Sequence, residues 1–176
     1  NYLFACRLRR FFPDGVPQDV ITNILSAYKM FSSTHKPCLI LAHVQSVLNQ
    51  WNTGRRYGLP LECPFKCGFP SDCISHILCC EVFQHLFHAS MGQAVHALSL
   101  HELFLFQCNG SFLRPLSRRY AMLYVFTCFR AFNCCWHEAA LTARLIDHIL
   151  NVLGAHCPAS RRDIIFFRSH PAYALD

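Results

Sequence analysis

Four residues between positions 63 and 80 have the types and the spacing of metal ligands. Cys63 and Cys67 are separated by three residues, and His76 and Cys80 follow one turn apart in a helical pattern. A structural zinc ion takes four Cys or His ligands in a tetrahedron, and side chains at i and i+4 share one face of a helix. The pattern therefore predicts one structural zinc ion with this ligand set: Cys63, Cys67, His76 and Cys80.

Neighbouring residues leave alternatives open. Cys79 is at i+3 from His76 and could replace Cys80 as the fourth ligand, and Cys73 also competes for a place. Without a metal, the same thiols would fill the core of a reduced helical hairpin, since free Cys behaves as a small apolar residue. Asp72 would either cap the following helix or orient the His76 imidazole. Capping is the preferred interpretation.

A basic and aromatic stretch surrounds the first cysteine. Arginine forks bind phosphate bidentately, and aromatic rings stack on bases. The sequence therefore predicts a nucleic-acid-binding set: Trp51, Arg55, Arg56, Tyr57 and Lys66. Phe65 is a further candidate for stacking. In the alternative interpretation, Trp51 fills the core and the two arginines cap carbonyl groups or lie in solvent.

The composition favours a heavily buried chain, or one that covers apolar surface with partners. Of the 176 residues, 53% are apolar and 16 are Phe, and the net charge is +6. Most of the basic residues are Arg, the residue preferred for phosphate contacts. The 12 Cys include adjacent pairs, which fits free thiols and one metal site better than a disulfide framework.

We therefore expect an intracellular, reducing compartment, with no distinction between the nucleus and an organelle. No secretory signal is evident and the first residue is not Met, so we expect a processed product or a piece of a longer chain.

Helical periodicity defines the elements that position these residues. Apolar spacing predicts helices over about 17–34, 37–51, 73–90, 100–106 and 115–153, and another after 160. The predicted apolar stripe of the first is Val20, Ile24, Ala27 and Phe31, and that of the second is Ile40, Val44, Val47, Leu48 and Trp51. Ser99 and Glu102 form a capping-box pattern at the start of the helix over 100–106. The apolar run 120–136 contains Arg130 and is shorter than a membrane span needs, so we interpret it as a buried helix. We predict an all-α domain of five to seven helices. Its segments are a helical pair (1–60), a zinc-binding loop and helix (61–92) and a helical region (93–176), packed as one compact unit.

The order of these features resembles the region downstream of the polymerase domain in reverse transcriptases of non-LTR retroelements, most of all the protist type. The resemblance spans about residues 7–137. It is carried by Trp-x-Thr-x-Arg-Arg-aromatic at 51–57, Cys-x3-Cys at 63–67, Asp-x3-His-x3-Cys at 72–80, and the helix 118–133. The resemblance implies a zinc-binding module that helps to hold a nucleic-acid template, with the same four ligands.

Catalysis is not expected of this chain. It has no Tyr-x-Asp-Asp or comparable aspartate pair, so any polymerase activity would lie elsewhere in a longer parent. No signature marks a Cys or Ser nucleophile, and four protein ligands close a zinc site.

The expected function is a non-catalytic, zinc-stabilised module that binds RNA or DNA and derives from or belongs to a retroelement reverse transcriptase polyprotein. The alternative is a retroelement-derived structural subunit that contacts other proteins through aromatic surface. One basic face containing Arg55, Arg56 and Lys66 would favour the first. Scattered arginines around exposed Phe patches would favour the second.

Overall fold

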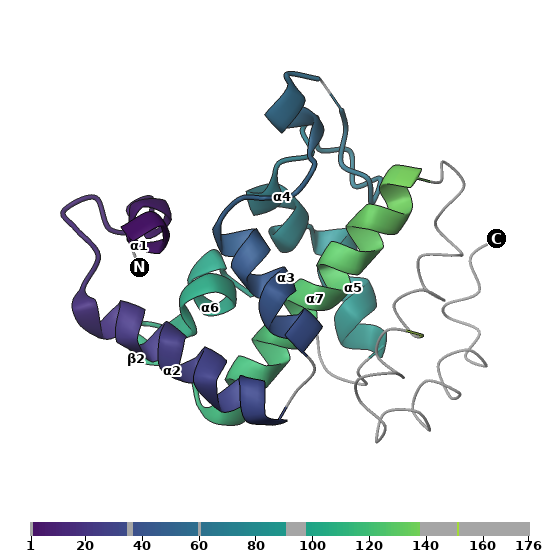
Figure 1. Ribbon diagram of the computed structural model, residues 1–176. Coiled ribbons are helices and arrows are strands. Elements are labelled where there is room, and N and C mark those ends of the chain that lie inside the picture. The colour runs from purple at the N-terminus through teal and green to yellow at the C-terminus, as the bar shows by residue number, and fades with distance from the viewer. Residues whose placement is uncertain (1, 35–36, 60, 91–97, 138–150, 152–176) are drawn as a thin grey trace. The chain divides into compact units, whose positions relative to one another are not determined.

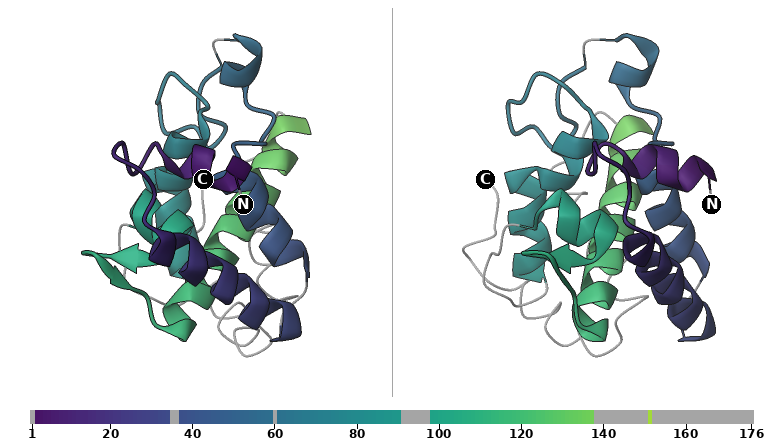
Figure 2. Two further views of the ribbon diagram at one scale, coloured as in Figure 1. Left: turned by 60° about the vertical axis from the view of Figure 1, so that its left-hand side comes forward. Right: turned by 90° about the vertical axis from the view of Figure 1, so that its left-hand side faces the viewer.

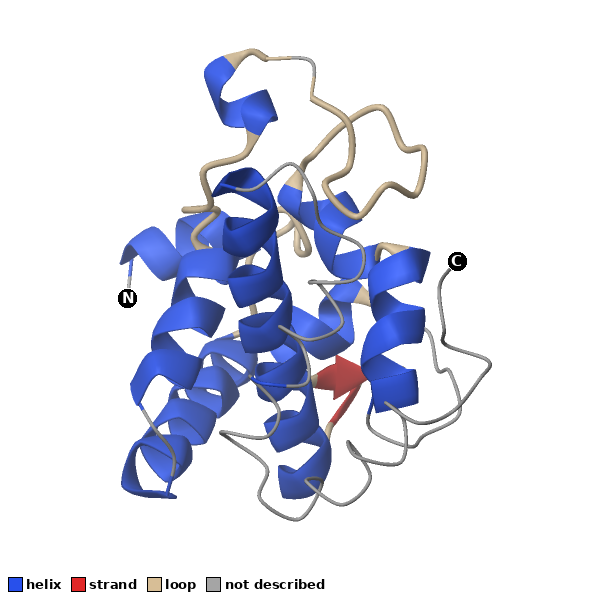
Figure 3. Ribbon diagram, turned by 90° about the vertical axis from the view of Figure 1, so that its right-hand side faces the viewer, coloured by secondary structure: helices blue, strands red, loops and turns tan. Residues whose placement is uncertain are grey.

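The computed structural model describes residues 2–34, 37–59, 61–90, 98–137 and 151. These residues are mostly helical (Figures 1 and 3), which confirms the predicted fold class. The α-helices of this part of the chain are α1 (Tyr2–Leu8), α2 (Gln18–Thr34), α3 (Pro37–Val47), α4 (Ile74–Cys79), α5 (Glu81–Ser90), α6 (Leu100–Leu105) and α7 (Pro115–His137). They are joined by a 3-10 turn, η1 (Gly54–Tyr57), and by two short strands, β1 (Gln107–Cys108) and β2 (Ser111–Phe112). The helices predicted beyond His137 lie outside the described residues.

The chain divides into two compact units that interleave along the sequence. The first unit comprises Asn1–Asn52 and Ser99–Phe126, and the second comprises Thr53–Leu98 and Thr127–Asp176. The predicted zinc-binding segment 61–92 lies wholly in the second unit. The predicted segment 93–176 is shared between the two, and so is α7, which gives residues 115–126 to the first unit and 127–137 to the second.

In the first unit, α2 buries the apolar stripe expected from its sequence. Val20, Ile24, Ala27 and Phe31 recur every three or four residues and are all buried, as an amphipathic helix requires.

None of the helices in the described ranges is both long enough and apolar enough to cross a membrane.

The buried face of α3 differs from the predicted one. It is formed by Leu39, Ala42, His43, Ser46 and Val47, whereas Ile40 and Val44 are only half-buried. The helix also ends at Val47, and Asn49 then adopts a left-handed conformation with φ of 57°. Relative to the prediction, the helix is rotated about its axis because His43 and Ser46, the two polar residues of this face, have hydrogen-bond partners inside the first unit.

His43 is the centre of a buried hydrogen-bonded group that joins three helices. Its Nε2 lies 2.7 Å from the carbonyl oxygen of Leu103 on α6, and its Nδ1 lies 2.7 Å from the hydroxyl of Tyr28 on α2. A carbonyl oxygen only accepts, so Nε2 carries the proton and Nδ1 accepts from Tyr28. The ring also stacks on Phe106 at 4.7 Å. Neutral His43 therefore connects α2, α3 and α6.

The segment from Ser99 to Phe112 contains the predicted capping box and a short hairpin that was not predicted. The Ser99 hydroxyl accepts from the Glu102 backbone while the Glu102 carboxylate accepts from the Ser99 backbone, which confirms the capping box. β1 and β2 pair antiparallel across Asn109 and Gly110, both at positive φ, as a type I′ turn requires. Figure 2 shows this hairpin as the pair of short arrows.

The second unit has an aromatic and aliphatic core beneath its loops. Ile77 and Leu78 of α4 and Phe83 and Phe87 of α5 are fully buried. The Cys128 thiol of α7, in the part that belongs to this unit, lies 3.6 Å from the Ile77 carbonyl oxygen. Residues 53–73 precede this core in the sequence. The metal-ligand candidates come from this segment, from α4 and from the turn between α4 and α5.

Candidate metal centre

The first two candidate ligands come from a tight loop, residues 63–69, which we call the cysteine loop. Its ends pair through a hydrogen bond from the Cys63 N–H to the Phe69 carbonyl (3.0 Å), and the Lys66 N–H donates to the Cys63 carbonyl (3.0 Å). Lys66 and Gly68 adopt left-handed conformations, with φ of 56° and 83°. Gly68 suits such a position because it has no Cβ. These turns place Cys67 opposite Cys63.

The other two candidates come from a helix break that the sequence analysis missed. The predicted helix 73–90 is interrupted at Cys80, whose backbone is extended with ψ of 120°. α4 ends at Cys79 and α5 begins at Glu81. Cys80 therefore occupies the position before the first turn of α5, where unpaired backbone N–H groups face the preceding side chain. His76 and Cys80 still converge, but from a helix and from the turn after it.

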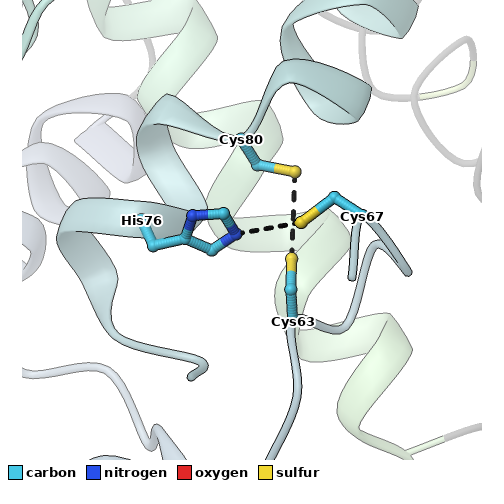
Figure 4. Close-up of side chains that lie close together, drawn as sticks. All are labelled: Cys63, Cys67, His76 and Cys80. Carbon is cyan, nitrogen blue, oxygen red and sulfur yellow. Dashed lines mark hydrogen bonds between the residues drawn. The ribbon is translucent and has the colours of Figure 1, made fainter. Parts of the chain in front are cut away.

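The four candidate ligand atoms converge on one point (Figure 4). The sulfur atoms of Cys63, Cys67 and Cys80 and a ring nitrogen of His76 all lie within 4.8 Å of one another. Cys63 Sγ and Cys80 Sγ are 3.8 Å apart, and Cys67 Sγ is 3.1 Å from His76 Nε2. With Zn–S bonds near 2.3 Å, a regular tetrahedron has sulfur–sulfur edges of about 3.8 Å. These four residues lie close enough to hold a metal ion.

The Cys63 and Cys80 thiols are electrostatically prepared for a cation. The Cys63 thiol donates to the Cys80 sulfur, and this hydrogen bond, with the backbone groups of Phe83 and Val82, lowers the pKa of Cys80 to about 5 against the opposing effect of burial. The same hydrogen bond with Cys80, together with burial, raises the pKa of Cys63. Binding of a metal ion would displace the proton that links these two sulfur atoms.

Cys79 faces away from this cluster. Its sulfur lies 3.8 Å from the Leu98 carbonyl oxygen. Burial, together with the negative charges that Cys73 and Cys80 would carry, raises the pKa of Cys79 to about 11. The structure thus brings Cys80, and not Cys79 or Cys73, together with the other three residues.

Asp72 has a different role from the one preferred from the sequence. The residue at the N-cap of α4 is Cys73, and its side chain makes no capping hydrogen bond. Asp72 is buried, and its carboxylate accepts a hydrogen bond from the backbone N–H of Gly54. Gly54 is the first residue of η1. Asp72 therefore stabilises the start of the 3-10 turn that carries Arg55 and Arg56.

The predicted nucleic-acid-binding residues fall into two groups. Trp51 is only 1% exposed, and its indole N–H donates to Ser46 Oγ at 3.0 Å. Phe65 is also buried and stacks on Phe83 at 5.0 Å. Both rings fill the core, so the prediction that they stack on bases is wrong, and the alternative interpretation of Trp51 is correct.

The remaining members of the predicted set belong to the second unit. Arg56, Tyr57 and Lys66 are exposed, and Arg55 lies with Arg56 and Tyr57 on η1. Figures 1 and 2 show η1 and the cysteine loop projecting from the same end of this unit. The structure therefore groups these residues near the candidate ligands without the two buried rings.

Two further features of the structure were not predicted from the sequence. Phe69 stacks on the candidate ligand His76, with ring centroids 3.9 Å apart and an interplanar angle of 11°. Its position two residues after Cys67 is the only local signal. The His43 group depends on partners at positions 28 and 103, and no spacing rule connects residues so far apart.

Comparison with known proteins gives no further constraint, because no family model, curated protein or solved structure matches this chain. The candidate function therefore depends on the chemistry of the site.

Proposed function

We propose that this chain is a non-catalytic, zinc-stabilised nucleic-acid-binding module that derives from or belongs to a retroelement reverse transcriptase polyprotein. The observation that carries the proposal is the convergence of three Cys and one His on one point, beside a turn that carries two arginines. The resemblance of segments 51–57 and 63–80 to the retroelement region supports the same reading.

Zinc is the metal that this donor set fits best. Thiolate ligands favour Zn²⁺, Cu(I) and iron–sulfur chemistry, and a tetrahedral set of sulfur and imidazole ligands is typical of Zn²⁺. Four protein ligands fill the tetrahedron and leave no position for a substrate or a reactive water. The site would then hold the cysteine loop against α4 and the start of α5, and its role would be structural.

The charges near the site suit a phosphate backbone. Arg56 and Lys66 are exposed and form no ion pair within the described residues. Arg56 lies on η1, whose first N–H is hydrogen bonded to Asp72, and Lys66 lies on the cysteine loop. Both cations are thus carried by segments that the metal centre would order, so phosphate affinity should depend on the metal.

The zinc part of the proposal is tested by metal analysis. The purified chain should contain about one zinc per molecule by mass spectrometry. Cys63→Ser should lose the metal, while Cys108→Ser should retain it, because Cys108 is exposed on β1 of the first unit. A folded wild type without zinc would remove the metal from the proposal.

The nucleic-acid part is tested by titrating the zinc-loaded chain against a fluorescent oligonucleotide at several salt concentrations. The double variant Arg56→Ala/Lys66→Ala should weaken binding and lower the slope of log affinity against log salt by about two, one for each phosphate contact. Lys29→Ala removes an exposed cation from α2 of the first unit and is the matched control. Equal effects of the two changes would contradict the assignment of the phosphate site.

A structural subunit is the second candidate, and one observation favours it. Leu25, Met30 and Leu41 are exposed on α2 and α3 of the first unit, Leu41 by 57%. However, the described phenylalanines are mostly in the core, and Phe69 is the one that counts among the exposed large apolar residues. Most of the described Phe side chains therefore stabilise the fold, which favours the nucleic-acid proposal over assembly through Phe patches.

A further inference from the structure

Among the phenylalanines of the described residues, Phe69 is the one that counts as an exposed large apolar residue. It closes the cysteine loop through its carbonyl, and its ring lies flat on the His76 imidazole. Yet the side chain is 44% exposed. Exposing an aromatic ring forgoes much of the free energy that its burial would supply, so the position needs an explanation other than the core.

The stack on His76 fixes the orientation of this ring. One face of Phe69 is covered by the imidazole at 3.9 Å, and no second aromatic contact of Phe69 occurs among the described residues. The imidazole in turn faces Cys67 through Nε2. A flat ring that is already immobilised loses little conformational freedom when another flat group stacks on it.

The charge around Phe69 identifies the chemistry of that group. Lys66 belongs to the same seven-residue loop, and the turn with Arg56 and Tyr57 projects from the same end of the unit (Figure 2). A flat, unpaired nucleobase linked to phosphates offers both an aromatic face for Phe69 and negative charge for the cations. In a duplex the faces of internal bases are already stacked on their neighbours, so a single strand fits better.

We propose that Phe69 is the base-stacking residue of this site and that the site therefore binds single-stranded nucleic acid. The base continues a column in which His76 and Phe69 are the first two rings. This inference rests on the proposed function, but it assigns the stacking role to a residue that the sequence did not indicate and commits the partner to unpaired bases.

The test compares three ligands with the zinc-loaded chain: a single-stranded oligonucleotide, an abasic oligonucleotide of the same length, and a blunt duplex. Phe69→Leu should weaken binding of the single strand by about 5- to 100-fold, as measured for other base–aromatic stacks. The same change should leave abasic binding unaltered, because that ligand offers phosphates only. Phe69→Trp keeps an aromatic face and should restore most of the single-strand affinity.

Zinc content separates a stacking role from a structural one, since each variant must still hold about one zinc per chain. Equal weakening of the single-strand and abasic ligands by Phe69→Leu would overturn the inference. So would single-strand binding that is lost in Arg56→Ala/Lys66→Ala but unchanged in Phe69→Leu, although the proposed function would stand. If none of the three ligands binds in a salt-dependent manner, the proposed function fails as well.

Discussion

At Cys80 the backbone leaves one helix and enters the next, and this break decides which sulfur joins the other three candidate ligands. In a continuous helix, Cys79 and Cys80 would lie 100° apart around the axis, and either could approach His76. The extended backbone at Cys80 instead directs its sulfur toward Cys63 and toward the N–H groups of the first turn of α5. The Cys80 thiolate is therefore stabilised at the point where the four candidate ligands converge.

This geometry predicts opposite results for two adjacent serine substitutions. Cys80→Ser should lose the zinc and much of the thermal stability of the second unit, because three ligands hold the ion more weakly than four. Cys79→Ser should keep about one zinc per chain, because its sulfur faces the Leu98 carbonyl. Metal analysis and thermal unfolding measure both effects. Zinc retained in Cys80→Ser and lost in Cys79→Ser would reverse the assignment.

Spacing alone was enough to predict which four residues converge, because they lie within 18 residues of one another and their separations are local properties. It could not predict the choice between Cys79 and Cys80, which depends on where the helix breaks. The local sequence also could not predict the burial of Trp51. Its place beside Arg55 and Arg56 suggests a stacking residue, but its indole N–H donates to Ser46 on a buried face of α3. Tertiary burial overrode the local pattern.

At the scale of the element, η1 depends on a carboxylate from a distant part of the sequence. Asp72 accepts from the Gly54 N–H across 18 residues. Asp72→Ala should leave this N–H without its partner, destabilise the turn by about 1–3 kcal/mol, and weaken oligonucleotide binding while zinc content stays the same. Asp72→Asn keeps an acceptor and should behave more like the wild type. Unchanged amide exchange at η1 in Asp72→Ala would contradict this role.

The connection among α2, α3 and α6 has a pH dependence of its own. Burial lowers the pKa of His43 to about 4, against an opposing effect of the Leu103 carbonyl. The unfolded chain, with an ordinary pKa near 6.5, therefore binds more protons between pH 6.5 and 4. Stability is thus greatest above pH 6.5 and falls by roughly 3 kcal/mol as the pH drops to 4.

Urea unfolding from pH 7.5 to 4 tests this prediction, with His43→Gln as the control. The variant should be less stable at pH 7.5 but should show a shallower decline on acidification, because it has no imidazole to protonate at that position. Release of zinc in acid affects both proteins alike, so the difference between their slopes isolates His43. Identical slopes would show that His43 does not contribute.

At the scale of the molecule, the two stabilising centres belong to different units. The four metal-ligand candidates lie in the second unit, and the three residues of the His43 group lie in the first. Because metal-binding free energy is folding free energy for the segment that binds it, a chelator should act unevenly. Amide exchange should accelerate around Ile77 and Gln84, and remain slow around Ile24 and Leu103. Uniform acceleration would show that the units unfold together.

The interleaving of the units could not be predicted from the sequence. Helix periodicity and cap residues are local, and they predicted the stripe of α2, the capping box and the first residue of α7 correctly. The assignment of segment 53–98 to a separate unit depends instead on pairs such as His43 and Leu103, which are 60 positions apart. No periodic pattern contains that information, so three consecutive segments were the natural but insufficient prediction.

The interleaving also sets an order of events on the ribosome. The nascent chain exposes residues 53–98 before residues 99–126, so the first unit cannot close until the second unit's metal-binding segment has emerged. If that segment binds zinc as proposed, it can do so while Leu103, the α6 partner of His43, is still being synthesised. A captured ion would shorten the flexible loop that must close between α3 and α6. Metal supply during translation would then influence how fast the first unit closes.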